Sequence, residues 1–235
     1  MLEAQNQIDF VVVGRIMDEQ SLGVREQSEA MPERDFPLSV RLNAKWGPPR
    51  LARAFDRQRL LDEFDRLTAR QCTWLVAPGG YGKTYLLQSY IKARQRPALW
   101  YNLDEGDSDV VGFFSDFCEA LERVGLGPLL RLSPEVQSLS RFGRLFFHQF
   151  GERCREPTLL VLDDYHHVAA DSGLHEAIAA ALDYLPVALH LILLSREAPP
   201  PAFARAQSHL QMGILVRRAC PHGGRGNRDR PLGDK

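Results

Sequence analysis

The sequence lacks several features that would point to a disulfide-stabilised or polyanion-binding protein. It has 4 cysteines in 235 residues, none of them in a CxxC pair, and its 29 basic and 30 acidic side chains leave a net charge of -1. Widely spaced cysteines indicate free thiols in a reducing compartment. The balanced charge excludes the overall basicity that attracts nucleic acid or anionic membranes, so any site for a polyanion has to be local.

A long apolar run is also missing from the amino terminus. The apolar stretch found there, Phe10–Val13, is short, follows Asp9 and has no basic segment before it. A membrane-spanning helix needs about 20 apolar residues, and a signal peptide needs a basic segment ahead of its apolar one. We therefore expect a soluble, cytoplasmic protein.

Apolar runs of strand length alternate with helical patterns along most of the chain. Near-continuous apolar runs occupy residues 73–77, 98–103, 158–163 and 189–195, and a further candidate strand occupies 211–216. Between them, apolar residues recur at helical spacing: Leu86, Leu87, Tyr90 and Ile91; Phe113, Phe114, Phe117, Cys118 and Leu121; Leu145, Phe146 and Phe150; Leu174, Ile178, Ala181 and Leu182. The alternation predicts an α/β fold with a parallel sheet covered by helices on both faces.

The composition divides the chain into three parts. Residues 1–41 mix polar and charged side chains and are expected to form a loosely ordered lead-in. Residues 42–216 form the predicted domain, which begins with an amphipathic helix carrying Leu60, Leu61, Phe64 and Leu67 on one face. Residues 217–235 are basic and almost free of apolar side chains, so they are expected to be a disordered tail.

The stretch APGGYGKTY, residues 77–85, matches a phosphate-binding P-loop except that Ala77 replaces the first glycine. In such a loop the glycines let backbone N–H groups converge on phosphate oxygens, the lysine reaches the β and γ phosphates, and the Ser/Thr hydroxyl holds Mg²⁺. The alternative is a plain glycine-rich turn, but the stretch follows a predicted strand and opens a predicted helix. The predicted nucleotide-binding residues are Gly79, Gly80, Tyr81, Gly82, Lys83, Thr84 and Tyr85.

Two acids and an arginine follow other predicted strands. Asp163 and Asp164 end the run at 158–163, and Arg196 follows the run at 189–195. Asp163 is a candidate metal ligand together with Thr84, and Asp164 is a candidate for positioning an attacking water. Arg196 can face the γ-phosphate where the carboxyl ends of parallel strands meet. The alternatives are acids that begin a turn and an arginine on a surface loop.

Five blocks of the sequence resemble a known family. They are PPRLARAFDRQRLL, APGGYGKTYLL, LWYNLDEGDSDVVGFF, LLVLDDYHHV and LHLILLSREAPP, between about residues 42 and 219. In order and spacing they resemble the MalT-type STAND NTPases, the ATP-dependent LuxR-family transcriptional regulators. The resemblance implies an AAA-related ATPase core that binds ATP and Mg²⁺ and hydrolyses ATP slowly, with the strand before Arg196 lying between the P-loop strand and the strand of Asp163.

The resemblance implies roles for the residues at matching positions, and this sequence departs from the family pattern in two respects. It assigns Lys83 and Thr84 to phosphates and Mg²⁺, Asp163 to the metal, Asp164 to water activation and Arg196 to the γ-phosphate. Tyr85 stands where the family usually has a second Thr, which puts one phosphate contact in doubt. The sensor and helix-turn-helix regions of the family are not found, so the chain is expected to be a truncated or frame-shifted fragment that does not bind specific DNA. Self-association on ATP binding is a further hypothesis.

Two alternative functions and two further motifs stand beside this interpretation. A poorly folded remnant and a small-molecule kinase on the same scaffold are the alternative functions. The acidic stretch at 103–109 is expected to begin a helix, with Ser108 or Asp109 as its cap, rather than to bind a cation. His166 and His167 are not expected to bind metal, because neighbouring side chains point apart and no further ligand follows at suitable spacing.

Overall fold

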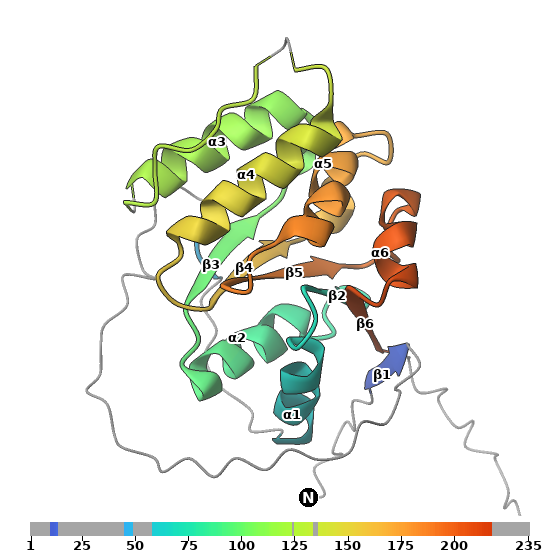
Figure 1. The fold of residues 1–235 in the computed structure, drawn as a ribbon. Coiled ribbons are helices and arrows are strands. Elements are labelled where there is room, and N and C mark those ends of the chain that lie inside the picture. Colours follow the sequence, from blue (N-terminus) through green and yellow to red (C-terminus); the bar gives the residue numbers. More distant parts are fainter. Residues whose placement is uncertain (1–9, 14–44, 49–57, 124, 134–135, 218–235) are drawn as a thin grey trace, which may run out of the picture.

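A computed structural model describes residues 10–13, 45–48, 58–123, 125–133 and 136–217, which form one sheet with helices on both sides (Figure 1). The strands are β1 (Phe10–Val13), β2 (Cys72–Val76), β3 (Ala98–Asn102), β4 (Thr158–Asp163), β5 (Leu189–Ser195) and β6 (Met212–Arg217). The α-helices are α1 (Gln58–Leu67), α2 (Lys83–Arg94), α3 (Val110–Arg123), α4 (Leu139–Arg153), α5 (Gly173–Ala181) and α6 (Ala204–Ser208). Short 3-10 helices are η1 (Glu105–Ser108), η2 (Tyr165–His167), η3 (Leu182–Tyr184) and η4 (Pro201–Phe203).

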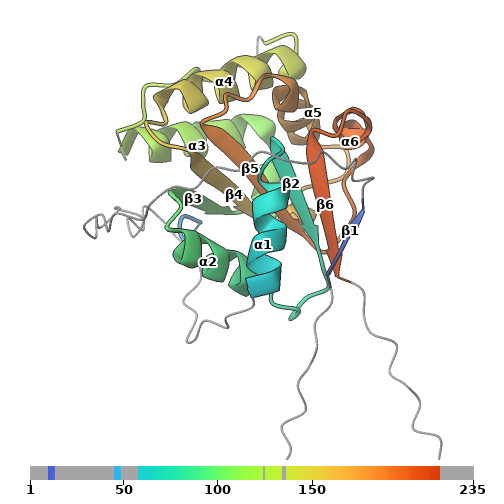
Figure 2. The same ribbon diagram turned by 60° about the horizontal axis from the view of Figure 1, so that its bottom comes forward.

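The sheet has the order β1-β6-β2-β5-β4-β3, and every pairing from β6 to β3 is parallel, whereas β1 pairs antiparallel with β6. Helices α3, α4 and α5 cover one face and α1 and α2 cover the other (Figures 1 and 2). The predicted α/β fold is therefore confirmed. The position of β5 between β2 and β4, which the family resemblance implied, is confirmed as well.

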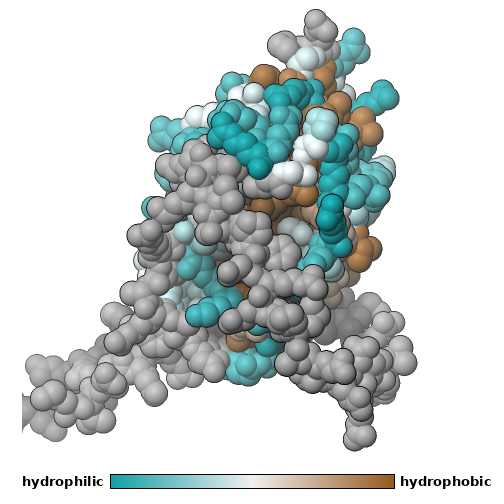
Figure 3. Space-filling view, turned by 90° about the vertical axis from the view of Figure 1, so that its left-hand side faces the viewer, coloured by the Kyte–Doolittle hydropathy of each residue, from teal (hydrophilic) through white to brown (hydrophobic). Residues whose placement is uncertain are grey.

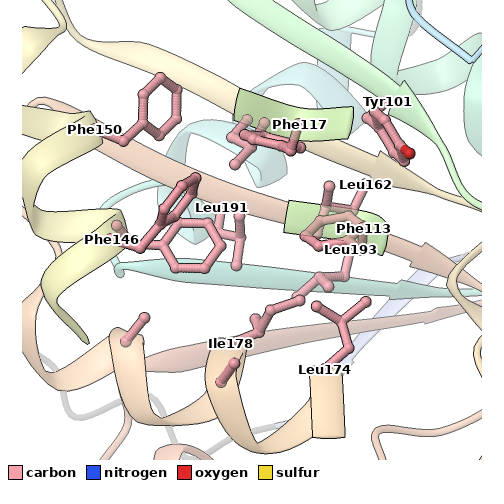
Figure 4. Packing of buried hydrophobic residues seen from close by; sticks show 14 of the residues in the cluster. Tyr101, Phe113, Phe117, Phe146, Phe150, Leu162, Leu174, Ile178, Leu191 and Leu193 are labelled. Atoms are coloured by element: carbon pink, nitrogen blue, oxygen red, sulfur yellow. The ribbon is translucent and has the colours of Figure 1, made fainter. Parts of the chain in front are cut away.

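Alternate residues of each central strand enter two separate cores. In β4, Leu160 and Leu162 face the core under α3, α4 and α5, while Leu159 and Val161 face the core over α1 and α2. This is the period-2 alternation of a strand buried on both faces, and it explains why the strand sequences are continuously apolar. Figure 4 shows side chains from α3, α4 and α5 meeting those of the strands, among them Phe117, Phe146, Leu162, Ile178 and Leu191.

The predicted elements are found, with shifts at their ends and one misplaced residue. Strand β2 begins and ends one residue earlier than predicted, and β6 one residue later. In α4, Leu145 was expected on the buried face but is 50% exposed, whereas Phe142 and Phe147 are buried. The reason is that α4 packs against both α3 and α5, so its buried face is centred on Phe142, Phe146, Phe147 and Phe150, and Leu145 lies on the side away from it.

The ends of the chain fall largely outside the described residues. Of the predicted lead-in, Phe10–Val13 pair with β6, and of the predicted tail, Arg217 ends β6. The rest of both segments lies outside the described part, so the domain boundaries stay predictions. Within the described residues, no helix is long and apolar enough to cross a membrane, and Cys72, Cys118 and Cys154 are free. Hydrophilic side chains predominate on the described part of the face in Figure 3, with hydrophobic ones between them.

A buried histidine joins two of the central strands. The Thr73 hydroxyl of β2 lies 3.1 Å from His190 Nε2 of β5, and His190 Nδ1 lies 2.6 Å from the Arg70 carbonyl oxygen. A carbonyl oxygen only accepts, so Nδ1 carries the proton and donates, and the Thr73 hydroxyl donates to Nε2. Burial lowers the pKa of His190 from its usual 6.5 to about 4. The ring is therefore neutral in the folded protein near pH 7.

We expect folding stability to fall in acid because of His190. Above pH 6.5 the ring is neutral in both the folded and the unfolded state and does not change the free energy of unfolding. Below pH 6.5 the unfolded chain binds a proton that the folded chain does not bind until about pH 4, so stability falls. The loss should reach about 1–3 kcal/mol between pH 6.5 and 4.5, from about 1.4 kcal/mol per pKa unit. Urea unfolding at several pH values measures it. The pH slope should be shallower in His190→Asn, and unchanged in His148→Asn on exposed α4 surface. Equal slopes in all three proteins would contradict this account.

Candidate functional site

The loop between β2 and α2 exposes glycine backbone at the start of a helix. Gly80 and Gly82 have φ values of +75° and +76°, a conformation that residues with a Cβ rarely adopt. Gly79, Gly80 and Gly82 are exposed, so the loop presents its backbone to solvent. Helix α2 begins at Lys83, directly after Gly82, and no side chain caps it. The first N–H groups of a helix have no partner within it, and they attract anions.

Lys83 is folded back under this loop. Its ammonium donates to the Ala77 carbonyl oxygen at 2.6 Å and to the Pro78 carbonyl oxygen at 3.4 Å, and the residue is only 8% exposed. Burial lowers the pKa of Lys83, and Arg196 lowers it further, while Asp163 and Asp164 oppose this. The lysine thus lies under the loop, near enough to Asp163, Asp164 and Arg196 for their charges to act on it.

Thr84 and Asp163 are joined across the sheet edge. The Thr84 hydroxyl, in the first turn of α2, donates to Asp163 Oδ2 at 3.0 Å, and Asp163 ends β4. The two residues come from strand–helix units far apart in the sequence, and the intervening β5 sets their separation. A hydroxyl and a carboxylate held together are oxygen donors of the kind that Mg²⁺ prefers. The chemistry of this pair therefore fits the predicted metal role.

Asp163 is buried at a place where its charge is unfavourable. It is 3% exposed, and its other oxygen accepts a hydrogen bond from the Asp164 backbone N–H at 2.8 Å. Burial, and after it the neighbouring Asp164, raise the pKa of Asp163 to about 6 against the opposing effect of the bonds from Asp164 N–H and Thr84. A nearby cation would relieve this unfavourable charge. Titratable groups held at unusual pKa values are typical of functional sites.

Asp164 and Arg196 complete the cluster from two strand ends. Asp164 has a φ of +55°, uncommon for a residue with a Cβ, and its side chain is half exposed beside buried Asp163. Arg196 is exposed directly after β5, and its guanidinium lies so close to Gly79 that a Cβ there would be 3.5 Å from Cζ. The structure thus brings Lys83, Thr84, Asp163, Asp164 and Arg196 to one edge of the sheet. Their individual roles stay predictions.

The acidic stretch after β3 has a structural role. The Asp109 side chain accepts hydrogen bonds from the N–H groups of Val111 and Gly112 at the start of α3, so it is the expected cap. Asp107 is buried and accepts from Tyr101 at 2.8 Å and from the Lys45 ammonium at 3.0 Å. No group of three or more His, Cys, Asp or Glu side chains that could hold a metal occurs among the described residues.

His166 lies beside Asp164 in the structure, a proximity that the sequence did not reveal. Its ring centroid lies 4.4 Å from that of His167, so the expectation that the two side chains point apart is wrong. The cause is the 3-10 turn η2, which brings successive side chains closer than an extended strand does. His166 Nδ1 lies 3.9 Å from Asp164 Oδ1. The only available signal was the position of this histidine three residues after Asp163.

Residues 56–196 match the protein family described as AAA domain. The HTH-type transcriptional regulator MalT of Vibrio cholerae is 31% identical over 158 residues, which are 65% of this chain and 17% of that protein. MalT of Serratia proteamaculans is 35% identical over 170 residues, which are 70% of this chain and 18% of that protein. The chain thus spans less than a fifth of the length of these curated relatives.

Among solved structures, the replication initiator DnaA bound to AMPPCP and single-stranded DNA is similar, with a TM-score of 0.38 and 16% identity. The match covers 69% of this chain and 45% of that chain. A likeness of this strength carries no argument about function.

Replacing Asp163 by Asn should stabilise the protein in the absence of ligand. The pKa of Asp163 is raised from 3.8 to about 6 in the folded state. Its carboxyl group therefore does not lower the free energy of unfolding below pH 3.8, where it is protonated in both states, and lowers it to the full extent above pH 6. We expect Asp163→Asn to raise the free energy of unfolding at pH 8 by about 1–3 kcal/mol and the gain to shrink as the pH approaches 4. Thermal melts measure it, with exposed Asp116→Asn as the control. A lower melting temperature at pH 8 would mean that the hydrogen bonds to this carboxylate outweigh its burial.

Proposed function

The chain belongs to the AAA domain family, and we propose that it binds ATP with Mg²⁺ and acts as a slowly hydrolysing switch domain. The observation that carries the proposal is the bond between Thr84 and Asp163 beside the buried Lys83, at the mouth of a glycine loop that opens a helix. A glycine-rich turn without a ligand would have no need for a buried lysine or for a carboxylate held against the helix start.

The phosphates would lie against the loop and the start of α2. Backbone N–H groups at the amino end of α2 would bind phosphate oxygens, with the helix dipole adding attraction. The Lys83 ammonium, which donates to Ala77 and Pro78 carbonyl oxygens, would exchange one or both of these for a phosphate oxygen. A charge-assisted bond to phosphate is stronger than one to a neutral carbonyl, so the exchange favours binding.

Thr84 and Asp163 are the residues that would hold Mg²⁺. The ion supplies positive charge that neutralises the phosphates and, at the same time, the buried carboxylate of Asp163. Asp164, half exposed beside it, would orient the attacking water. Arg196, exposed next to Gly79, would contact the γ-phosphate, and the loss of that contact after hydrolysis would distinguish the two nucleotide states.

We further propose that this domain serves a transcriptional regulator in the cytoplasm. The support is the similarity to MalT regulators over 65–70% of this chain. In such a protein the nucleotide acts by favouring one conformation over another. Self-association on ATP binding would be one output of the switch, and light scattering with and without a non-hydrolysable ATP analogue measures it.

Lys83→Ala should strongly weaken nucleotide binding. Losing the ammonium removes the main positive charge that the loop offers to the phosphates, and we expect the Kd for a non-hydrolysable ATP analogue with Mg²⁺ to rise by about 100-fold, equivalent to about 2.7 kcal/mol. Isothermal titration calorimetry measures it. Lys92→Ala is the matched control, because Lys92 lies exposed near the other end of the same helix. Equal affinity of the two variants would remove the basis for the proposal.

Asp164→Asn should separate hydrolysis from binding. Loss of the carboxylate that orients water should lower ATP turnover by about tenfold or more, while the affinity for the non-hydrolysable analogue stays within about twofold. Phosphate release under saturating ATP measures the first and calorimetry the second. Exposed Asp171→Asn is the control for a lost surface charge. Unchanged turnover in Asp164→Asn would reject the water-orienting role.

A further inference from the structure

Trp74 of β2 joins the strand before the glycine loop to the turn that carries Arg196. Its side chain is fully buried, and its indole Nε1–H donates to the Glu197 carbonyl oxygen at 3.0 Å. A buried tryptophan usually finds a partner for this N–H, so the location of the partner is what matters. Trp100 donates to a side chain of its own strand, and Trp46 Nε1 has no partner among the described residues. Of the three tryptophans, Trp74 is thus the one whose N–H bonds to a loop of the candidate site in the described part of the chain.

Side chains hold both backbone polar groups of Glu197 in the turn after β5. The Glu197 N–H donates to Ser195 Oγ at 3.0 Å, and the Glu197 carbonyl oxygen accepts from Trp74. Glu197 directly follows Arg196, whose exposed guanidinium lies beside Gly79 of the glycine loop. The Arg196 side chain therefore extends from a backbone that is fixed next to it. A long side chain loses less conformational entropy on binding a ligand when its backbone is already held in place.

The indole ring of Trp74 also packs against two other rings near the site. Its centroid lies 5.0 Å from that of Tyr165, the residue after Asp164, and 5.3 Å from that of Phe203 in η4, both in edge-to-face arrangements. All three rings are buried. Edge-to-face pairs are favourable beyond the area that they bury, so the rings hold one another in place. One side chain thus contacts the residues that directly follow Arg196 and Asp164.

We propose that Trp74 is a positioning residue, which holds the turn of Arg196 within reach of the terminal phosphate and so increases the preference of the site for a nucleoside triphosphate over a diphosphate. The inference rests on the proposed function, in which Arg196 contacts the γ-phosphate. A diphosphate has no γ-phosphate. Releasing the turn therefore weakens the binding of the triphosphate and leaves that of the diphosphate unchanged, which reduces the difference on which a switch depends.

The test compares triphosphate and diphosphate binding in matched variants of the full chain. Trp74→Phe keeps an aromatic ring and removes the indole N–H, and Trp100→Phe makes the same change at a buried tryptophan that bonds within its own strand. Calorimetry gives the Kd for a non-hydrolysable ATP analogue with Mg²⁺ and for ADP with Mg²⁺. We expect Trp74→Phe to weaken triphosphate binding about three- to tenfold, the value of one hydrogen bond, and diphosphate binding less than about twofold. Trp100→Phe should leave the ratio of the two Kd values unchanged, because a general loss of stability affects both nucleotides alike.

A double-mutant cycle with Arg196→Ala tests whether Trp74 acts through the arginine. Arg196→Ala should weaken triphosphate binding selectively, and adding Trp74→Phe to it should cause no further change in the ratio of the two Kd values. A further loss of the same size in the double variant would mean that Trp74 acts independently of Arg196, and it would overturn the inference. An Arg196→Ala variant with the same ratio as the unaltered chain would overturn it as well.

The outcomes also separate this inference from the function on which it rests. If the unaltered chain binds both nucleotides and Trp74→Phe weakens them equally or not at all, the positioning role is wrong and the nucleotide site stands. If the unaltered chain binds neither nucleotide, both proposals fail. Should Trp74→Phe not fold, ¹⁵N NMR of the indole N–H groups in the unaltered chain decides, with Trp46→Phe and Trp100→Phe identifying the Trp74 signal by elimination. A shift of this signal with the triphosphate analogue and not with ADP supports the role, and equal shifts or none overturn it.

Discussion

The parallel pairing of β2, β5 and β4 is the constraint on which the site depends. Parallel strands end at the same edge, and the register places Val76 opposite Ser195 in neighbouring strands. The glycine loop follows β2, Arg196 follows β5 and Asp163 ends β4. Three segments that are far apart in the sequence therefore meet at one edge of the sheet. Their separation is set by backbone hydrogen bonds that hold neighbouring strands about 4.8 Å apart, and side-chain changes at the surface hardly alter it.

The two cores hold the strand ends at this edge in place, while the loops beyond the strand ends are exposed to solvent. Strand side chains that alternate between the faces bind the sheet to α3, α4 and α5 above and to α1 and α2 below. The interior is densely packed, so the strand ends cannot shift independently. The loops beyond those ends carry the exposed backbone of Gly79, Gly80 and Gly82 and the exposed Arg196. The groups that we propose to contact the nucleotide are thus carried at the ends of strands that the two cores hold in place.

The charges at the edge oppose stability in the absence of a ligand. Asp163 is buried beside Asp164, Lys83 is buried under carbonyl oxygens, and Arg196 is a second positive charge nearby. These arrangements are unfavourable individually and complementary to a magnesium-bound polyanion, which brings charge of both signs. A site that is unfavourable when empty gains more from its ligand, which is how binding can select one conformation.

The sequence alone determined strands β2 to β6, helices α1 to α5, the glycine loop and the candidate acids, because strand burial and helix periodicity are local patterns of side chains and the loop is a contiguous motif. It did not predict β1 or α6. It could not show that Leu145 lies outside the core, since the face of α4 that is buried depends on how the two neighbouring helices pack against it. The strand order agreed with the family resemblance and did not follow from the strands themselves.

Only the tertiary structure decided which polar groups share the site. The bond from Thr84 to Asp163 joins residues 79 positions apart, and the bond from Trp74 to the Glu197 carbonyl oxygen joins residues 123 positions apart. Burial and distance between segments are properties of the packed chain, whereas residue type and spacing are properties of the sequence. For that reason the sequence identified the loop and the acids that could bind phosphate and metal, and the fold determined how they are held together.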